Sequence, residues 1–276
     1  MNRATRLPLT GAPSARPLDL SRAGMPSLDS VHTVIPFKPR AAGPEYTIVR
    51  TTEVDSYEPS ALAVRRVLKG TAVPPRPALV AALKARPRAG DDFAGTDRKA
   101  AKLSIPDAQI ERFQDLNALI DSLESEEHMI HHTPRITTGA TSKRVKEEMR
   151  KVGVRGFLYA ASREADNDFH LIVGRDPAAT PEMYMTMELS GLPPAASAAF
   201  DTLKSARDAF QGFFGAQHLP GLGYDFYHPA IPVAIEGALF FDMTHSSGQR
   251  PGPPSLKSRM PTIWEVHPVT AITLEP

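Results

Sequence analysis

The chain has 276 residues, of which 41% are hydrophobic and 23% are charged, so it can bury a sizeable core and is not disordered throughout. It contains no cysteine, which excludes disulfides, thiolate catalysis and cysteine-ligated zinc. Residues 151–276 hold 9 basic and 13 acidic side chains, whereas a nucleic-acid surface needs a basic stripe, so nucleic acid is an unlikely partner for this half.

The first part of the chain predicts little regular structure. Residues 1–44 are rich in Pro, Arg, Ser and Gly and have no sustained apolar period, which is typical of a disordered leader. Only residues 31–37 are expected to dock as a short extended piece. This leader lacks the apolar core of a signal peptide, and no stretch reaches the roughly 20 apolar residues of a membrane span. We therefore take the cytoplasm as the default location.

A mostly helical segment is expected over residues 45–151. Residues 46–52 are β-branched and aromatic, which predicts a strand. Apolar side chains at three- and four-residue spacing predict a long helix over residues 106–126. Shorter helices are predicted over residues 60–68, 77–84 and 142–151.

From residue 152 onward the apolar pattern changes to period two. It predicts strands over residues 154–161, 168–173 and 183–189, a helix over 198–214, and strands over 231–241 and 263–274. This β-β-β-α-β-β order is that of the OB-fold, a five-stranded Greek-key barrel with a helix between its third and fourth strands. We therefore predict an α+β protein with a disordered leader (1–44), a mostly helical segment (45–151) and an OB-like antiparallel barrel (152–276).

Acidic residues and histidines recur together on the predicted barrel. They lie at the start of its second strand, at the end of its third, after its fourth and inside its fifth. The residues are Asp166, Asp168, His170, Glu188, Asp242, His245, Glu265 and His267. In the OB order the first and fourth strands pair, and we expect the fifth to return beside the first. That arrangement would bring the separate acid–histidine pairs close together.

Two interpretations of these residues remain open. A buried histidine beside a carboxylate commonly fixes a loop, so each pair can be a structural hydrogen bond. Alternatively, carboxylates and imidazoles are ligands for a hard or borderline divalent cation. In that case the candidate ligands are Asp168, His170, Asp242 and His267, and a divalent metal is the only cofactor that the sequence suggests.

The strings DNDFHLIV, FFDMTH and IWEVHPVTAI, with the strand that ends near Glu188, resemble a group of functionally uncharacterised bacterial proteins. The recurring strings of that group are similar to D-x-D-[FY]-H-L, F-F-D-x-x-H and E-[LIV]-H-P-V. The resemblance covers residues 154–276 and implies an OB-like barrel. It singles out the same acids and histidines, but it implies no activity. Residues 246–260 depart from the pattern of the group.

Other motifs indicate less. The string EEHMIHH places His128, His131 and His132 at the end of the long predicted helix, where cationic side chains commonly cap a helix. The first two have a spacing that can also share a metal. The sequence has no phosphate-binding P-loop, no dinucleotide-binding glycine motif opening a βαβ unit and no nucleophile elbow.

These patterns favour a binding or interaction module built on an OB-like barrel. Its expected partner is a protein, a peptide or a small ligand, and neither a nucleic acid nor a membrane. The alternative is a metal-dependent hydrolase of the phosphodiesterase or nuclease type. In that alternative Asp168, Asp242 and Glu188 hold Mg²⁺ or Ca²⁺, and His170 or His267 activates water.

Overall fold

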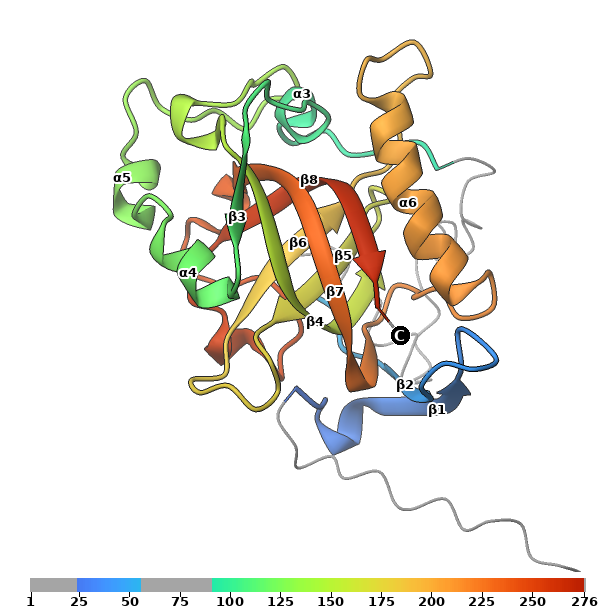
Figure 1. The fold of residues 1–276 in the computed structure, drawn as a ribbon. Helices are drawn as coiled ribbons and strands as arrows, with labels where there is room; N and C mark the ends of the chain where they lie inside the picture. The colour runs from blue at the N-terminus through green and yellow to red at the C-terminus, as the bar shows by residue number, and fades with distance from the viewer. Residues whose placement is uncertain (1–23, 56–90, 276) are drawn as a thin grey trace, which may run out of the picture.

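The computed structural model of the chain describes residues 24–55 and 91–275. Within them the fold mixes α and β structure, with one eight-stranded sheet and a few short helices (Figure 1). The strands are β1 (Val31–Phe37), β2 (Tyr46–Thr51), β3 (Ile110–Phe113), β4 (Lys151–Arg163), β5 (Phe169–Gly174), β6 (Tyr184–Leu189), β7 (Asp225–Phe241) and β8 (Trp264–Leu274). The α-helices are α3 (Lys99–Lys102), α4 (Leu116–Asp121), α5 (Glu126–Ile130) and α6 (Phe200–Phe214). The 3₁₀ helices are η1 (Leu28–Ser30), η2 (Lys146–Glu148), η3 (Met243–His245) and η4 (Lys257–Arg259).

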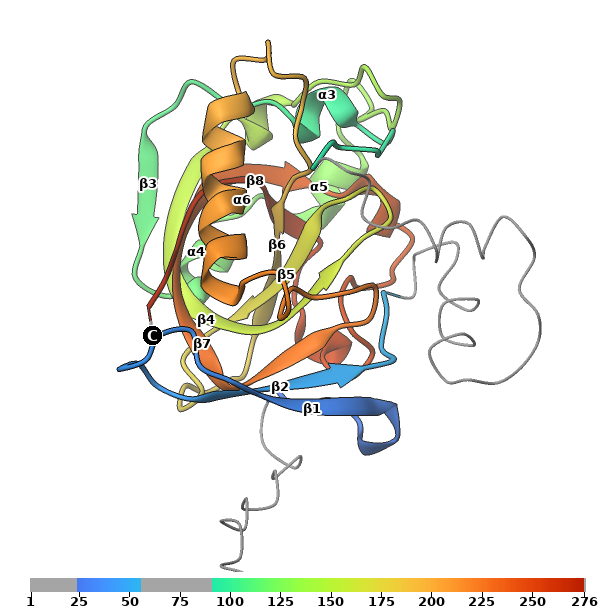
Figure 2. The ribbon, with the colours of Figure 1, turned by 90° about the vertical axis from the view of Figure 1, so that its right-hand side faces the viewer.

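Five of the strands close on one another through hydrogen bonds. β4 pairs with β5, β5 with β6, β6 with β8, β8 with β7, and β7 pairs again with β4. Among these five pairings, only that of β6 with β8 is parallel. We call these five strands the strand ring. One apolar core draws on all of them, and α6 packs against β8 and β6 (Figure 2).

The predicted order of elements after residue 152 is confirmed, because β4, β5, β6, α6, β7 and β8 follow one another along the chain. The expected pairing of the first and fourth of these strands is also confirmed, as β4 with β7. The expectation that the last strand lies beside the first is wrong, since β8 pairs with β6 and β7. The reason is that β4 already has β7 along one edge and β3, then β5, along the other.

The long helix predicted over residues 106–126 is wrong. Ile110–Phe113 forms β3, which pairs in parallel with β4, and the helical part is reduced to α4 and α5. Pairing with β4 overrides the helical spacing, and Asp115 then begins α4 by accepting a hydrogen bond from the backbone of Asn117. The short helices predicted over residues 60–68 and 77–84 lie outside the described residues.

The helix predicted over residues 142–151 is also wrong. The segment contains only η2 and then enters β4. Glu148 is fully buried at this point and pairs with both terminal nitrogens of the Arg98 guanidinium. A regular helix cannot continue here because residues from Lys151 onward are held in β4 by β3 and β7.

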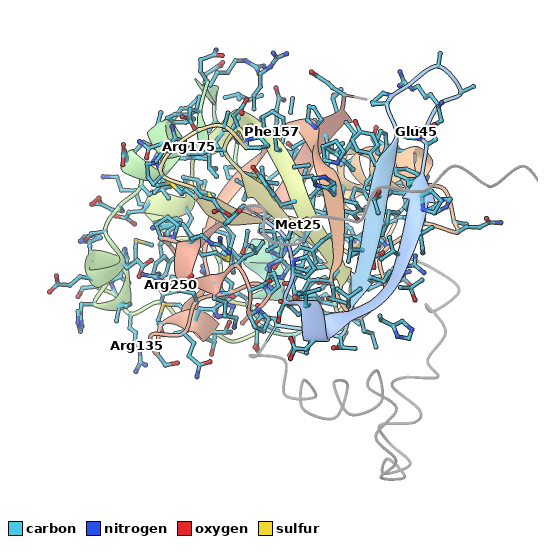
Figure 3. The ribbon with its side chains drawn as sticks, turned by 90° about the horizontal axis from the view of Figure 1, so that it is seen from below. Met25, Glu45, Arg135, Phe157, Arg175 and Arg250 are labelled. Atoms are coloured by element: carbon cyan, nitrogen blue, oxygen red, sulfur yellow. The ribbon has the colours of Figure 1, made fainter. Side chains whose placement is uncertain are left out.

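The N-terminal strands attach to the ring along β7. Val31–Phe37 docks as the short extended piece that we expected and forms β1, and the strand predicted over residues 46–52 is confirmed as β2. β1 pairs with β2, β2 pairs with β7, and Glu45 marks the loop between β1 and β2 (Figure 3). Strands on both sides of the expected domain boundary at residues 151/152 thus belong to one sheet. The division of the chain into three domains stays a prediction. No helix within residues 24–55 and 91–275 is long and apolar enough to cross a membrane.

We expect Asp225→Asn to flatten the pH dependence of stability below neutrality. Burial raises the pKa of Asp225 from 3.8 to about 7, although Arg50 at 3.2 Å lowers it. The folded protein therefore holds this proton more tightly than the unfolded chain, so stability falls as the pH rises from about 4 to 7. Urea unfolding across this range should show the wild type losing up to about 1.4 kcal/mol per pH unit more than the variant. Asp201→Asn, at an exposed site in α6, should keep the wild-type slope, and equal slopes for all three proteins would refute the assignment.

Candidate metal centre

The predicted acids and histidines gather where β5 begins, β6 and β7 end and β8 begins. Register explains the convergence, because His170 on β5 pairs with Glu188 on β6, and Thr186 on β6 pairs with Glu265 on β8. Side chains of directly paired residues lie on the same face of a sheet. Three groups of potential ligands result within the described residues, each with donor atoms within 4.8 Å of one another.

The central group consists of Asp168, Glu188 and His267. All three side chains are buried, and His267 and Asp168 have no exposed surface at all. Nε2 of His267 lies 3.5 Å from Oδ2 of Asp168, and its Nδ1 lies 2.7 Å from Oε2 of Glu188. The other oxygen of Asp168 accepts a hydrogen bond from the backbone of Gly191 at 2.6 Å, which fixes the carboxylate in place.

The atoms of the central group that could bind a metal have no hydrogen-bond partner within the described residues. This holds for Oδ2 of Asp168, Oε2 of Glu188 and both ring nitrogens of His267. The contact between Glu188 and His267 is short, but the two groups do not have the alignment of a hydrogen bond. Buried polar groups are normally hydrogen-bonded, so these atoms, which are held in ion-pair contacts at 2.7 and 3.5 Å, need an explanation.

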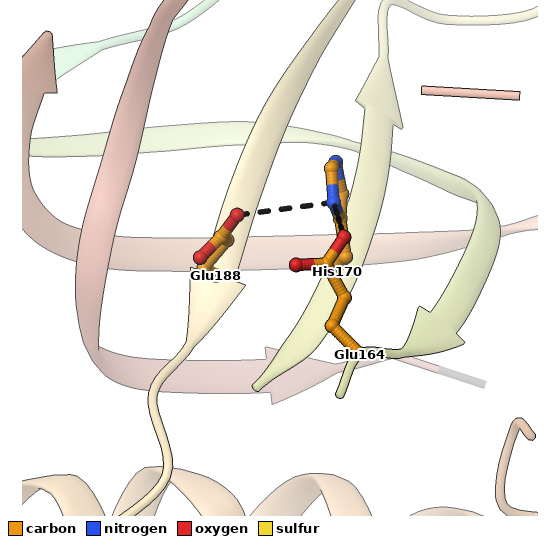
Figure 4. A group of neighbouring side chains, drawn as sticks. All are labelled: Glu164, His170 and Glu188. Carbon is orange, nitrogen blue, oxygen red and sulfur yellow. Dashed lines mark hydrogen bonds and ion pairs between the residues drawn. The ribbon is translucent and has the colours of Figure 1, made fainter. Parts of the chain in front are cut away.

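His170 belongs to a second group and differs from His267. Its Nδ1 lies 2.6 Å from Oε1 of Glu164 and 3.8 Å from Oε1 of Glu188 (Figure 4), and its Nε2 lies 3.2 Å from the hydroxyl of Thr186. Burial lowers the pKa of His170, but Glu164 outweighs this effect and raises the pKa to about 9. An imidazolium with both nitrogens hydrogen-bonded favours the structural interpretation for this residue.

The third group consists of Asp242, His245 and Glu265, all buried. Oδ2 of Asp242 lies 3.4 Å from Nε2 of His245. Oδ1 of Asp242 accepts hydrogen bonds from the backbone and the hydroxyl of Thr244, which orients the carboxylate at the start of η3. Neither oxygen of Glu265 has a hydrogen-bond partner among the described residues, and Oε2 lies 3.8 Å from Nδ1 of His267.

Asp166 and Lys102 form the more exposed edge of the cluster. Asp166 is 22% exposed and accepts a hydrogen bond from the backbone of Asp168, while Lys102 is 13% exposed. Nζ of Lys102 lies 3.9 Å from Glu188 and 4.0 Å from Asp166. Burial lowers the pKa of Lys102, but Glu188 and Asp166 raise it well above its usual value, so the ammonium stays charged.

The acids of the cluster outnumber its two cations, Lys102 and the His170 imidazolium. Burial raises the pKa of Asp168 well above its usual value, and the neighbouring Asp166 and Glu188 raise it further. Burial acts in the same way on the pKa of Glu265. By contrast, burial lowers the pKa of His267, which favours the neutral imidazole that binds a metal.

The structure therefore brings all eight predicted residues into one cluster, in which seven belong to the three groups and Asp166 lies at the edge. Sequence reasoning missed Glu164 and Lys102. Glu164 precedes Asp166 in the same acidic turn, and its position opposite His170 follows only from the β4–β5 pairing. Lys102 lies in α3, outside the strand ring, and no sequence pattern connects it to the cluster.

The other predicted features lie elsewhere. His128 and His132 flank Glu147, at 3.7 and 3.1 Å, on the surface near α5. A separate cavity of about 340 Å³ is lined by Phe157 and Arg175 among others (Figure 3), and it contains none of the eight residues. Arg175 is paired there with Asp115 at 2.7 Å.

Comparisons of the chain with protein-family models, with curated proteins and with solved structures found no match. Function therefore has to be inferred from the chemistry of the site itself.

Proposed function

We propose that this protein is a binding module whose ligand is a divalent metal ion, held between Asp168, Glu188 and His267. The observation that carries the proposal is the set of buried donor atoms, two carboxylate oxygens and two imidazole nitrogens, without hydrogen-bond partners among the described residues. A cation bound by one carboxylate oxygen each of Asp168 and Glu188 and by one ring nitrogen of His267 would satisfy three of these atoms and would offset buried negative charge.

The spacing of the donors agrees with this proposal. Two atoms that share a tetrahedral ion at about 2.1 Å lie about 3.4 Å apart. Nε2 of His267 and Oδ2 of Asp168 are separated by 3.5 Å. Carboxylate and neutral imidazole together suit Zn²⁺, Mn²⁺ or Fe²⁺ better than Ca²⁺, which prefers oxygen alone.

We also propose that the strand ring is an OB-like barrel. Its support is the cyclic pairing of β4, β5, β6, β8 and β7, together with α6 between the third and fourth of these strands. In such a barrel the metal would join the end of β6 to the beginnings of β5 and β8. It would thus stabilise the ring as well as serve as a ligand.

We expect the wild-type chain, stripped of metal, to bind Zn²⁺ or Mn²⁺ in calorimetric titration. Asp168→Asn should weaken this binding at least 100-fold, because an amide is a poorer ligand than a carboxylate and carries no charge. We expect the change to preserve the fold, since an amide oxygen at position 168 can still accept the hydrogen bond from Gly191. Asp201→Asn, at an exposed position, is the control and should bind as the wild type does. Failure of the wild type to bind either ion would end the proposal.

A metal-dependent hydrolase is the second candidate. The observation that favours it is the partial exposure of Lys102 and Asp166 beside the buried ligands. A bound metal would lower the pKa of a water molecule, and the Lys102 ammonium would attract the charge of a phosphodiester. Hydrolysis of bis(p-nitrophenyl) phosphate that requires both Mn²⁺ and Lys102 would support this candidate over binding alone.

A further inference from the structure

We infer that the protein holds a second divalent cation between Asp242, His245 and Glu265, beside the first. This inference rests on the proposed function because it extends one metal site to a centre of two. It concerns different ligands, however, so the two claims can fail separately.

Glu265 provides the observation that points to a ligand. Its side chain is 1% exposed, and neither carboxylate oxygen has a hydrogen-bond partner within the described residues. A buried carboxylate without hydrogen bonds is costly, and few native residues are left in this condition. The carboxylate faces the donors of Asp242 and His245, all within 4.8 Å of one another.

Asp242 and His245 complete a set of donors with the geometry of a shared ion. Oδ2 of Asp242 and Nε2 of His245 are 3.4 Å apart, which equals the separation of about 3.4 Å for two ligands of one tetrahedral ion. The hydrogen bonds from Thr244 to Oδ1 leave Oδ2 directed at His245. Two carboxylates and one imidazole again suit Zn²⁺, Mn²⁺ or Fe²⁺.

Glu265 also connects this group to the central one. Its Oε2 lies 3.8 Å from Nδ1 of His267, and His267 in turn contacts Glu188 and Asp168. A carboxylate has two oxygens and can bind one cation with each. Pairs of metals about 3.5 to 4 Å apart act together on phosphate esters and peptides in many hydrolases. The second cation would therefore supply the two-metal chemistry that a single buried ion lacks.

The test is the number of Mn²⁺ ions bound per chain at saturation, measured on the full-length protein by equilibrium dialysis and elemental analysis. We expect two ions for the wild type and for the exposed control Asp201→Asn. We expect one for Glu265→Gln and one for Asp242→Asn. The second variant is the safer one for folding, because an amide oxygen at position 242 still accepts the hydrogen bonds from Thr244. Electron paramagnetic resonance should show spin coupling between the two Mn²⁺ ions in the wild type and none in either variant.

Each outcome decides the inference. One ion in the wild type, retained by both variants, would overturn the second site and leave the proposed function standing. Loss of every ion from a folded Asp242→Asn variant would assign Asp242 to a single site and would also overturn the inference. No binding by the wild type would overturn both claims. Retention of one ion by both variants, with loss of the spin coupling, would establish the second site.

Discussion

Replacing Glu148 by alanine is expected to lower the free energy of unfolding by about 3 to 5 kcal/mol. The two oxygens of Glu148 lie 2.6 and 2.7 Å from the terminal nitrogens of Arg98, and both side chains are almost completely buried. Glu148 also accepts hydrogen bonds from the backbones of Val145 and Phe241, so it joins η2 to the end of β7. The substitution would leave the Arg98 guanidinium buried without its counter-charge.

Urea or guanidinium unfolding measures this loss directly. Asp208→Ala is a matched control, because Asp208 forms an exposed ion pair with Lys204, and it should cost less than about 1 kcal/mol. The double replacement Arg98→Met with Glu148→Leu should recover part of the loss, since a buried ion pair can often be replaced by apolar side chains. If Glu148→Ala and Asp208→Ala lower the free energy of unfolding by similar amounts, the buried pair of Glu148 and Arg98 contributes no more to stability than an exposed ion pair.

The second large effect is expected on metal-linked stability. A metal at a hundredfold excess over its Kd should stabilise the folded wild type by about 2.7 kcal/mol, because it binds the folded chain and not the unfolded one. For a chain of this size that is a rise in Tm of roughly 5 to 10 °C. His267→Gln should lose this gain, because His267 contributes a ring nitrogen to the central group. Thermal melts with and without Zn²⁺ or Mn²⁺ measure it.

His170→Gln provides the contrast between the two histidines. His170 is hydrogen-bonded to Glu164 and Thr186, so we expect its replacement to cost about 1 to 3 kcal/mol without metal. The gain on adding metal should nevertheless persist. If the metal-dependent gain disappears in His170→Gln and survives in His267→Gln, the cation lies in the group around Glu164, and our assignment of the ligands is wrong.

The elements after residue 152 could be read from the sequence because each carries its own pattern. The helix at residues 200–214 buries one face and β7 alternates in its middle part, so their apolar residues repeat at the spacing of the element. β5 and β6 are buried along their whole length and stand out as short, largely apolar runs. The segment before them carries a weaker pattern. There the apolar residues of β3 and α4 follow one another at helical spacing, and only pairing with β4 decides that Ile110–Phe113 is a strand.

The candidate ligands could also be chosen from the sequence, because acids and histidines placed together at strand ends are chemically conspicuous. Their grouping could not. The sequence treats His170 and His267 alike, as histidines beside acids. The fold places Glu164 and Thr186 against His170, so both of its ring nitrogens are hydrogen-bonded and the imidazole is protonated. The contacts of His267 lack the alignment of a hydrogen bond. The two histidines differ because of the register between strands that are far apart in the chain, and this register cannot be read from the local sequence.

By itself, then, the sequence determined the order of the strands and helix after residue 152, the absence of cysteine chemistry and the residue types of the site. The tertiary structure alone decided that β8 lies between β6 and β7, that Glu148 is buried against Arg98, and that Lys102 borders the acids. The physical reason is the range of the interactions. Side-chain period and turn chemistry act over a few residues, whereas strand pairing, burial and charge balance depend on segments that only the folded chain brings together.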